Sequence, residues 1–570
     1  MNFVFKMKDY SDWEPIYDYV NESPYIENIN RPWLKYRASN IPKSIKFDPI
    51  PVHELIGLTA KNFPNNVCIS HKTTNKKYTF RELTYISDKI SNALYQLGTK
   101  KGDAVGIMTG NCPEFLFCCL GIMKTGAIVI PINPLLKAWD VSHIIKETGN
   151  INTVFVHKGN FRTLKKAQKD GSLENIILLE ADLAKEGTIT LEEFIEGVAP
   201  IRPDIDINPS SDLAALLFTG GTTGLSKGVM LTHTNLVSCT LSTLLMPGEP
   251  EEGEDNFGKT VNLSVIPLCH SFGFLVMIAA VFGAAMLVTF PSFNASEVLK
   301  AIEYYKVTNF VGVPVMYQML INNPDFTERD LSNLEEANAG SAALPPELAK
   351  KWEEVIGIKV GQGFGLTETS PITHMAAKWM PEIRSESIGV PIIDTDAKIV
   401  NSETLKELET NEIGELLIKG PQIMKGYWKS PEETKKTIIN GWLRTGDLAR
   451  MDEQGYFYIE GRAKDIIKYK GYKVMPREVE EKLYEHPAIL EAGVVSAPDP
   501  NIGETIKAFV VLKPKFKESG ITEREIIDWA KERLAGYKYP RQVEFLNILP
   551  RTSVGKIFRR KLRERTVKEQ

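Results

Sequence analysis

Short apolar runs alternate with longer amphipathic segments from about residue 53 to about residue 460. The runs DAVGIMT, AIVIPIN, NTVFV, ENIILLE and NLSVIPL have the length and composition of buried strands, and the segments between them have helical spacing. This alternation predicts parallel sheets covered by helices on both faces. About 400 residues of such a pattern exceed one sheet. We therefore expect an α/β main domain of two doubly wound α/β subdomains, with a smaller β-rich subdomain near residues 385–455.

The pattern changes after Gly461. Pro476 suits the first turn of a helix, and Thr522 with Glu525 forms a capping box for a second helix that we expect to reach Gly536. The runs GVVSA, KAFVVL and VEFLNIL supply strands, so the C-terminal part is predicted to be a small, mobile α+β domain. The expected division is an N-terminal arm over residues 1–50, a main domain over 51–461, a hinge over 462–465 and a C-terminal domain over 466–570.

One uncharged run of 18 residues, from Gly273 to Phe290, has the minimum length for a membrane-spanning helix. Gly283 divides this run into a helix-like half and the β-like half AMLVTF. A helix and a strand buried in a doubly wound sheet have the same composition. We therefore expect buried structure here and no membrane span.

The balance of charged residues limits which classes of molecule the protein can attract. Lys and Arg total 68 against 72 Asp and Glu, so the net charge of −4 offers no general attraction for nucleic acid or an anionic membrane. Any phosphate binding has to come from local geometry. The six cysteines include no CxxC pair, which argues against a disulfide framework or a zinc site and favours a cytoplasmic protein.

A loop rich in glycine and threonine follows the apolar run LAALLF. Glycines let backbone amides approach phosphate oxygens, threonines add hydroxyl donors, and a lysine adds a positive charge. The spacing is not GxxxxGK[ST], so P-loop chemistry does not follow. A mobile surface loop is the alternative to a phosphate-binding loop. The candidate residues are Thr219, Gly220, Gly221, Thr222, Thr223, Gly224 and Lys227.

Four further segments carry groups suited to a nucleotide. GQGFGLTET, at residues 361–369, combines flexible backbone with an aromatic ring, a hydroxyl and a carboxylate, which together can stack a base, bind phosphate and ligand Mg²⁺. GWLRTGD ends on Asp447, an acceptor for ribose hydroxyls. Five cations lie between residues 461 and 473, and Lys556 follows a glycine-containing turn near the chain end. Taken singly, these segments are equally typical of plain turns and solvated basic loops.

With these motifs in this order, the chain resembles the AMP-forming acyl-CoA synthetases of the adenylate-forming superfamily, which also contains luciferases and peptide-synthetase adenylation domains. The resemblance covers residues 50–565, and GRAKDIIKYKGYKVMPREVE and LPRTSVGKIFRR are its most specific segments. It implies that a small carboxylic acid, ATP and CoA are converted to an acyl-CoA through an acyl-adenylate, with Mg²⁺ as cofactor and AMP and pyrophosphate as products. The oligomeric state stays open, a homodimer included.

The resemblance also implies roles for individual residues. The loop from Thr219 to Lys227 would close over the β- and γ-phosphates, Phe364 would stack on adenine, Thr367 would contact the α-phosphate, and Glu368 would ligand Mg²⁺. Asp447 would accept the ribose hydroxyls, with Arg462 beside it. The other positions implied to contact the nucleotide or CoA are Gly340, Ser341, Ala342, Gly363, Gly365, Leu366, Lys464, Gly471 and Lys473.

Two half-reactions follow from the same resemblance. Lys556 would stabilise the charge that builds up during adenylation. The C-terminal domain would then swing about Lys464, withdraw Lys556 and present Lys468 and Gly471 for thioester formation. His270 would lie near the reacting carboxylate and gate access to it, although a lone histidine before an apolar run is more often a core residue.

The identity of the acyl substrate is the part of the predicted function that the sequence constrains least. Acetate-selective relatives carry a tryptophan where this chain has Gly365, so we expect a pocket longer than two carbons and a shift towards acetate in Gly365→Trp. The uncharged run after His270 suits an aliphatic chain, which favours a medium-chain or longer fatty acid. A short hydroxy acid such as 4-hydroxybutyrate or an aryl acid is the alternative. A luciferase-like or carrier-loading enzyme is less expected, and a non-catalytic AMP sensor should have lost Lys556 or Glu368.

Overall fold

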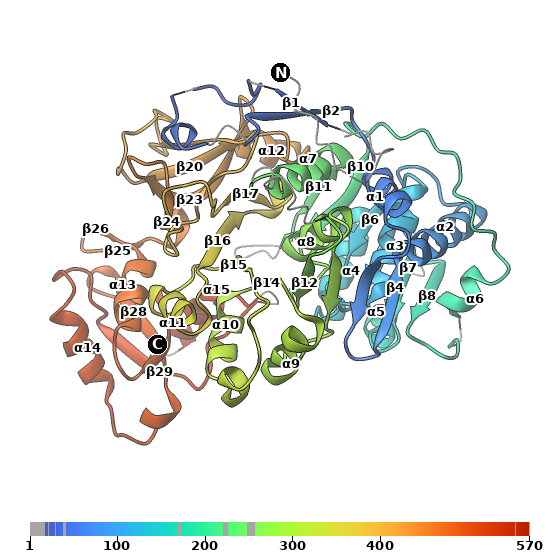
Figure 1. Ribbon diagram of the computed structural model, residues 1–570. Helices are drawn as coiled ribbons and strands as arrows, with labels where there is room; N and C mark the ends of the chain where they lie inside the picture. The colour runs from blue at the N-terminus through green and yellow to red at the C-terminus, as the bar shows by residue number, and fades with distance from the viewer. Residues whose placement is uncertain are drawn as a thin grey trace.

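The computed structural model describes residues 17–20, 22–28, 30–37, 41–168, 173–185, 187–219, 226–247, 257–552 and 555–568. It has a large N-terminal domain and a small C-terminal domain, both of mixed α/β structure (Figure 1). The α/β class that the alternating pattern predicted is confirmed. The small domain, orange to red in Figure 1, lies beside the end of the large domain where α10 and α11 are found.

Within the described residues, the first large sheet orders eight strands as β21-β11-β10-β6-β5-β7-β8-β9. Strands β6, β5, β7 and β8 run parallel, and β10 and β11 form an antiparallel hairpin. Alternate side chains of β5 pack into different cores, one with α2 and α3 and the other with α4 and α5, so helices cover both faces. The strands are β5 Ala104–Met108, β6 Ile128–Pro131, β7 Ile151–His157, β8 Asn175–Leu179, β9 Ile189–Thr190, β10 Leu213–Phe218, β11 Gly228–Thr232 and β21 Gly426–Tyr427; the helices are α2 Phe80–Gln96, α3 Pro113–Lys124, α4 Ala138–Thr148, α5 Phe161–Ala167 and α6 Leu191–Ile195.

The second large sheet orders nine strands, in the part of the chain that the structure describes, as β18-β17-β16-β15-β14-β12-β13-β3-β4. One face packs on α1, α7 and α8 and the other on α9, α10 and α11. The strands are β3 Val67–His71, β4 Lys76–Thr79, β12 Val261–Ser264, β13 Met286–Thr289, β14 Asn309–Gly312, β15 Glu336–Ala339, β16 Val360–Gly365, β17 Ile372–Met375 and β18 Val390–Pro391; the helices are α1 Val52–Asn62, α7 His233–Leu244, α8 Ser271–Phe282, α9 Ala295–Tyr305, α10 Pro314–Ile321 and α11 Pro346–Ile356.

The uncharged run forms α8 followed by β13, and most of its side chains are buried. The prediction of a buried helix and strand is therefore confirmed. Among the described residues, every helix is too short or too polar to cross a bilayer.

A third sheet, antiparallel throughout, forms the β-rich subdomain. It extends to Arg462, seven residues beyond the expected end at 455, because β24 pairs with β23 along its full length. Its strands are β19 Asp396–Val400, β20 Gly414–Lys419, β22 Ile438–Ile439, β23 Trp442–Met451 and β24 Phe457–Arg462, and α12 Pro431–Thr437 precedes β22.

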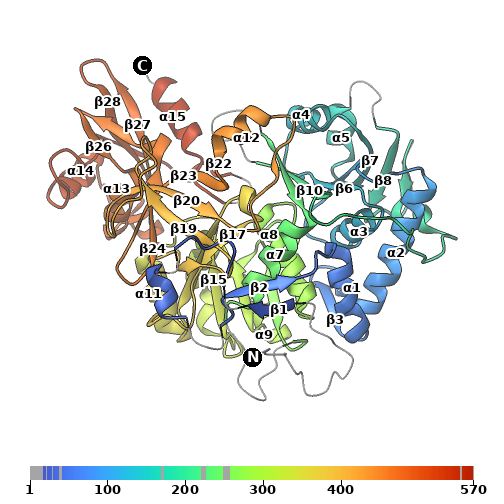
Figure 2. The ribbon, with the colours of Figure 1, turned by 90° about the horizontal axis from the view of Figure 1, so that it is seen from above.

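The N-terminal arm lies across the large domain, where its strands β1 (Tyr17–Val20) and β2 (Ser44–Phe47) pair with each other (Figure 2). Between them, a 3₁₀ turn, η1 (Pro32–Lys35), holds the fully buried Trp33. Arg31 Nε contacts Asp396 Oδ1 at 2.8 Å, and Ser23 Oγ donates to Asp394 Oδ1 at 2.6 Å. The arm is thus fastened to the edge of the β-rich subdomain.

The C-terminal domain packs two helices on a three-stranded sheet, with a small hairpin at its start and a final helix at its end, as the described residues show. The capping box of Thr522 and Glu525 is present. The helix that it starts ends at Lys531 and not near Gly536. Beyond Lys531 the Ala530 carbonyl accepts from the N–H groups of both Arg533 and Leu534, so the chain tightens into a turn. The elements are β25 Ile467–Tyr469, β26 Tyr472–Val474, α13 Pro476–Tyr484, β27 Ile489–Asp499, β28 Gly503–Leu512, η5 Pro514–Phe516, α14 Glu523–Lys531, β29 Gln542–Phe545 and α15 Arg559–Lys568.

Candidate active site

Lys556 lies in a tight turn between β29 and α15 that rests on the large domain. The Thr552 N–H donates to the Lys556 carbonyl at 2.8 Å, and Gly555 has a φ of +78°. A Cβ built on Gly555 would lie 3.4 Å from Val313 Cγ2, at the start of α10. This contact brings the chain end against the large domain, so the two domains share one site.

Three charged groups from distant parts of the chain, Arg462, Asp447 and Glu368, act on the Lys556 ammonium. Burial lowers the pKa of Lys556, and the positive charge of Arg462 lowers it further, whereas the carboxylates of Asp447 and Glu368 act in the opposite direction. A desolvated cation held between two carboxylates is suited to meeting the charge that develops on a substrate phosphate.

Asp447 is a buried carboxylate with a free acceptor. It lies on β23 opposite Arg462 on β24, and Arg462 Nε contacts its Oδ1 at 2.9 Å. Its Oδ2 is buried and accepts no hydrogen bond from any described residue. Burial raises the pKa of Asp447, while Arg462 and Lys556 oppose that shift. A buried carboxylate oxygen without a donor is unusual, and a ligand hydroxyl would satisfy it.

Glu368 and Thr367 lie in a 3₁₀ turn, η3 (Thr367–Thr369), directly after β16. Tyr427 donates its hydroxyl to Glu368 Oε1 at 2.7 Å, and Thr367 Oγ1 lies 3.3 Å from Ser271 Oγ at the start of α8. One carboxylate oxygen is thereby oriented, and the donor chemistry suits Mg²⁺. Sequence reasoning missed Tyr427, because a tyrosine after a glycine gives no sign of a partner far along the chain.

The glycine- and threonine-rich loop is described only at its base. The Thr219 N–H donates to the Lys227 carbonyl at 3.0 Å, and the Lys227 N–H donates to Thr219 Oγ1 at 3.3 Å, which closes the hairpin of β10 and β11. Lys227 Nζ contacts Glu433 Oε2 on α12 at 2.7 Å. Because this ion pair is exposed, it is weak, and a phosphate can replace the carboxylate. The positions 220–224 that were predicted to bind phosphate lie outside the described residues.

Two loops meet beside β16 at the expected adenine position. The segment Gly340, Ser341 and Ala342 follows β15, and the Gly340 N–H donates to the Gly312 carbonyl at 3.2 Å. A Cβ on Gly340 would lie 2.8 Å from the ring of Phe272, so only glycine fits this close approach. Gly363, Phe364 and Gly365 form the end of β16, and the Leu366 N–H donates to Thr369 Oγ1 at 2.9 Å.

Gly365 does not face open space. A Cβ built on it would lie 1.5 Å from the Pro371 carbonyl oxygen, at the irregular register between β16 and β17. The expectation that Gly365→Trp would simply shorten an acyl pocket is therefore wrong, because no side chain fits without moving the backbone. The glycine is required by packing, and by itself it carries no information on acyl chain length.

We expect Gly365→Ala to destabilise the protein by about 3 kcal/mol, the upper part of the range for overpacking. Gly363→Ala is the matched control two residues earlier on the same strand, since its Cβ would meet Ile372 Cδ1 at an ordinary 3.6 Å. Urea unfolding of both variants measures the difference. Equal stability of the two would show that the Pro371 contact is not tight.

His270 caps the N-terminus of α8. Its Nδ1 accepts a hydrogen bond from the Phe272 N–H at 3.3 Å, so the ring is held at the N-terminal end of α8. Burial lowers the pKa of His270 to about 4, and the nearby charge of Lys556 contributes. The imidazole is therefore neutral at physiological pH and acts as a positioned polar group and not as a cation.

The pH dependence of adenylation provides a test of this protonation state. We expect no loss of the adenylation rate between pH 8 and pH 5.5 that is due to His270, because the pKa of about 4 lies below that window. The measurement is the pH profile of pyrophosphate release for the wild type and for His270→Asn. An ionisation near pH 6.5 that disappears in the variant would contradict the prediction.

The structure does not bring every predicted residue to this site. Lys464, in the short turn η4 (Ala463–Asp465), is exposed and close enough to Asp447 to affect its pKa. Lys468, Gly471 and Lys473 lie on the β25 and β26 hairpin with exposed side chains or open space around them. In this domain arrangement, the charge of Lys556 lowers the pKa of Asp447 more than the charge of Lys464 does.

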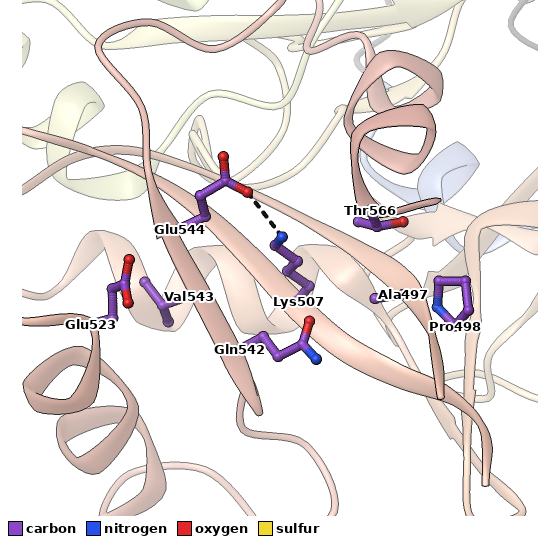
Figure 3. Close-up of a pocket in the computed structure, with 8 residues that line it drawn as sticks. All are labelled: Ala497, Pro498, Lys507, Glu523, Gln542, Val543, Glu544 and Thr566. Carbon is purple, nitrogen blue, oxygen red and sulfur yellow. Dashed lines mark ion pairs between the residues drawn. The ribbon is translucent and has the colours of Figure 1, made fainter. Parts of the chain in front are cut away.

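A separate pocket of about 400 Å³ lies within the C-terminal domain (Figure 3). Its centre is the ion pair of Lys507 Nζ with Glu544 Oε2 at 2.9 Å, between β28 and β29. None of the eight residues that line it belongs to the site above. The pocket therefore does not compete with the site at the domain boundary as the place of reaction.

The fold and the site together define an adenylate-forming enzyme. A carboxylate with a spare acceptor, a candidate metal ligand and a half-buried lysine converge beside the end of β16, which carries Phe364. The family model of the AMP-binding enzymes matches residues 58–428, and that of the AMP-binding enzyme C-terminal domain matches residues 478–556. The chain belongs to the AMP-binding enzyme family and, within it, to the AMP-forming acyl-CoA synthetases.

Similar proteins cover nearly the whole chain. A long-chain-fatty-acid–CoA ligase of Bacillus subtilis is 37% identical over 558 residues, which are 94% of this chain and 98% of that protein. A 4-coumarate–CoA ligase of Pinus taeda is 33% identical, with 92% and 97% covered. Among solved structures, the anthranilate CoA ligase AuaEII in complex with anthranoyl-AMP has a TM-score of 0.82 at 29% identity, with 93% of this chain and 99% of that chain covered.

Proposed function

We propose that this acyl-CoA synthetase activates a medium-chain or longer fatty acid, with Mg²⁺ bound at Glu368. The ATP-dependent formation of an acyl-CoA follows from the family. The choice of acid rests on one observation, the 37% identity to a long-chain-fatty-acid–CoA ligase over almost the full length of both chains. The reducing cytoplasm is the proposed compartment, because all six cysteines are unpaired and five are buried.

The residues at the domain boundary perform the first half-reaction. The substrate carboxylate attacks the α-phosphorus of ATP and pyrophosphate leaves, so negative charge develops on the phosphate oxygens. Lys556 meets that charge, Asp447 holds the ribose through its unpaired oxygen, and Thr367 contacts the α-phosphate. Mg²⁺ at Glu368 would supply further neutralisation of the phosphates.

The second half-reaction needs a different face of the C-terminal domain. The CoA thiolate attacks the carbonyl carbon of the acyl-adenylate and AMP leaves. Lys556 occupies the site in the present arrangement, and the exposed hairpin with Lys468, Gly471 and Lys473 would replace it after a rotation about Lys464. Gly471 has a φ of +84° and no atom within 4 Å of a built Cβ, so it leaves room for the CoA arm.

The helix after His270 supports an apolar acid. The residues of α8 carry no charge, and Val276 and Ala279 remain partly exposed, so they offer an apolar wall to a substrate. Each methylene that such a wall covers contributes roughly 0.8 kcal/mol. An aryl acid is the second candidate, because a 4-coumarate–CoA ligase and an anthranilate CoA ligase are also similar over more than 90% of this chain.

The test is a pyrophosphate-release assay with CoA across C2 to C16 fatty acids, 4-hydroxybutyrate, benzoate and 4-coumarate. We expect kcat/KM to rise with chain length from C2 to at least C8. A maximum for an aryl acid or for 4-hydroxybutyrate would overturn the proposed substrate and leave the reaction class in place.

A further inference from the structure

Four aromatic rings form a continuous column from the N-terminal arm to the candidate adenine platform. Trp33 of the arm lies 5.5 Å from Phe457, Phe457 lies 4.7 Å from His374, and His374 lies 6.0 Å from Phe364, all between ring centroids. All three contacts are edge-to-face, the geometry that aromatic pairs prefer. Trp33, Phe457 and His374 are each fully buried.

The outer end of the column is firmly held. Arg31 pairs with the buried Asp396 and lies over the Trp33 ring at 5.9 Å. On the other side, the turn before β24 comes so close that a Cβ on Gly455 would lie 2.5 Å from the Trp33 backbone nitrogen. The Trp33 ring therefore has little freedom to move away from Phe457.

The middle of the column is tied to the backbone of the site. The Phe457 N–H donates to the Gly389 carbonyl at 3.0 Å. Thr373 donates its hydroxyl to the Phe364 carbonyl at 3.2 Å and lies 3.0 Å from His374 Nδ1. Thr373 therefore contacts both the Phe364 carbonyl and the His374 ring. His374 thus packs on the ring of Phe364, and its neighbour Thr373 holds the Phe364 carbonyl.

We propose that the N-terminal arm sets the affinity for the adenine nucleotide through this column, with Trp33 and His374 as positioning residues for Phe364. The inference rests on the proposed function, in which Phe364 stacks on adenine. It gives Arg31 and Trp33 of the arm a role in nucleotide binding that their sequence does not suggest. Strand β24 reinforces the link, because Phe457 begins it and Arg462, the partner of Asp447, ends it.

The first test compares two fully buried tryptophans in the full-length chain. Trp33→Leu breaks the column, whereas Trp352→Leu makes a similar cavity among Phe310, Tyr317 and Phe326 in the other core. Equilibrium dialysis measures the Kd for AMP, and initial rates give the KM for ATP and for the fatty acid. We expect Trp33→Leu to weaken AMP binding and raise the KM for ATP about 3- to 10-fold, with the KM for the acid unchanged. Trp352→Leu should leave all three constants within about twofold of the wild type.

The second test does not depend on the stability of the arm variant. His374→Phe keeps a ring in the column, and His374→Leu removes it. We expect the Phe variant to bind AMP close to wild-type affinity and the Leu variant to bind it about 3- to 10-fold more weakly. The two variants should bind pyrophosphate equally well, because the column ends at Phe364, which is proposed to contact adenine and not the phosphates.

The outcomes separate this inference from the function on which it rests. If the wild type binds AMP and releases pyrophosphate with a fatty acid, yet Trp33→Leu shifts AMP binding no more than Trp352→Leu, the column has no positioning role. Equal AMP affinity in His374→Phe and His374→Leu would overturn it in the same way. If the wild type fails to bind AMP, the proposed function and the inference fail together.

Discussion

Lys556→Ala is expected to lower the rate of acyl-adenylate formation about 10²- to 10³-fold, the range found when one positioned donor to a developing negative charge is removed. The physical reason is the environment of Lys556, a half-buried ammonium close enough to Asp447, Glu368 and Arg462 for their charges to shift its pKa. Water cannot replace a fixed cation there without reorganising during the reaction. Thioester formation from supplied acyl-adenylate and CoA should stay within about twofold, because the proposed rotation would withdraw Lys556 from the site for that step.

Lys468→Ala is the matched control for this prediction. It removes a lysine of the same domain that lies exposed on the β25 strand, away from the present site. We expect it to spare adenylation and to slow the thioester step. Single-turnover measurements of the two half-reactions, with pyrophosphate and acyl-CoA as products, give both rates. Equal losses in both half-reactions for Lys556→Ala would contradict a domain movement between two faces.

Asp447→Asn is expected to raise the Kd for AMP about 10- to 100-fold, since a hydrogen bond to a charged group contributes about 1.5–3 kcal/mol. The buried Oδ2 accepts no hydrogen bond from the described residues, and a carboxylate can accept both ribose hydroxyls, whereas an amide has only one acceptor oxygen. The affinity for AMP, measured by calorimetry, should therefore fall much more than the affinity for pyrophosphate.

The same variant can be tested against the ribose directly. The wild type should bind 2′-deoxy-AMP or 3′-deoxy-AMP more weakly than AMP, and Asp447→Asn should lose most of that difference. Asp452→Asn is the control on the same subdomain, because its carboxylate also forms a close arginine pair, with Arg384 Nη1 at 2.7 Å, outside the site. If the Asp447 variant still distinguishes AMP from its deoxy analogues fully, Asp447 does not hold the ribose.

Much of the fold was predictable because local patterns determine it. Alternating apolar runs predicted parallel strands and their covering helices, and Thr522 with Glu525 predicted a helix start that the structure contains. The uncharged run was resolved correctly as α8 and β13 because Gly283 marks its break. Helix ends were less predictable: the tighter turn at Ala530 ends α14 early, although the apolar spacing continues.

Local patterns predicted the residue types of the candidate site but not the contacts between them. Motif order alone proposed Asp447, Glu368 and Lys556, but not the unpaired oxygen of Asp447, the phenol of Tyr427 on Glu368, or Lys227 paired with Glu433. Gly365 is the clearest case. Its sequence context suggested an open acyl pocket, whereas the Pro371 carbonyl fills the place of its side chain.

Patterns along the chain were enough to predict the class of fold, the order of the nucleotide-binding segments and the residue types available for adenylation. Spacing and composition are local properties, and hydrophobic periodicity records them directly. The three-dimensional packing was needed to show that Lys556 acts on Asp447 in this domain arrangement and that Gly365 must be glycine. It alone revealed that Trp33 lies three ring contacts from Phe364. Those facts depend on pairs of residues far apart in the chain, whose distances are determined by packing and not by any pattern along the sequence.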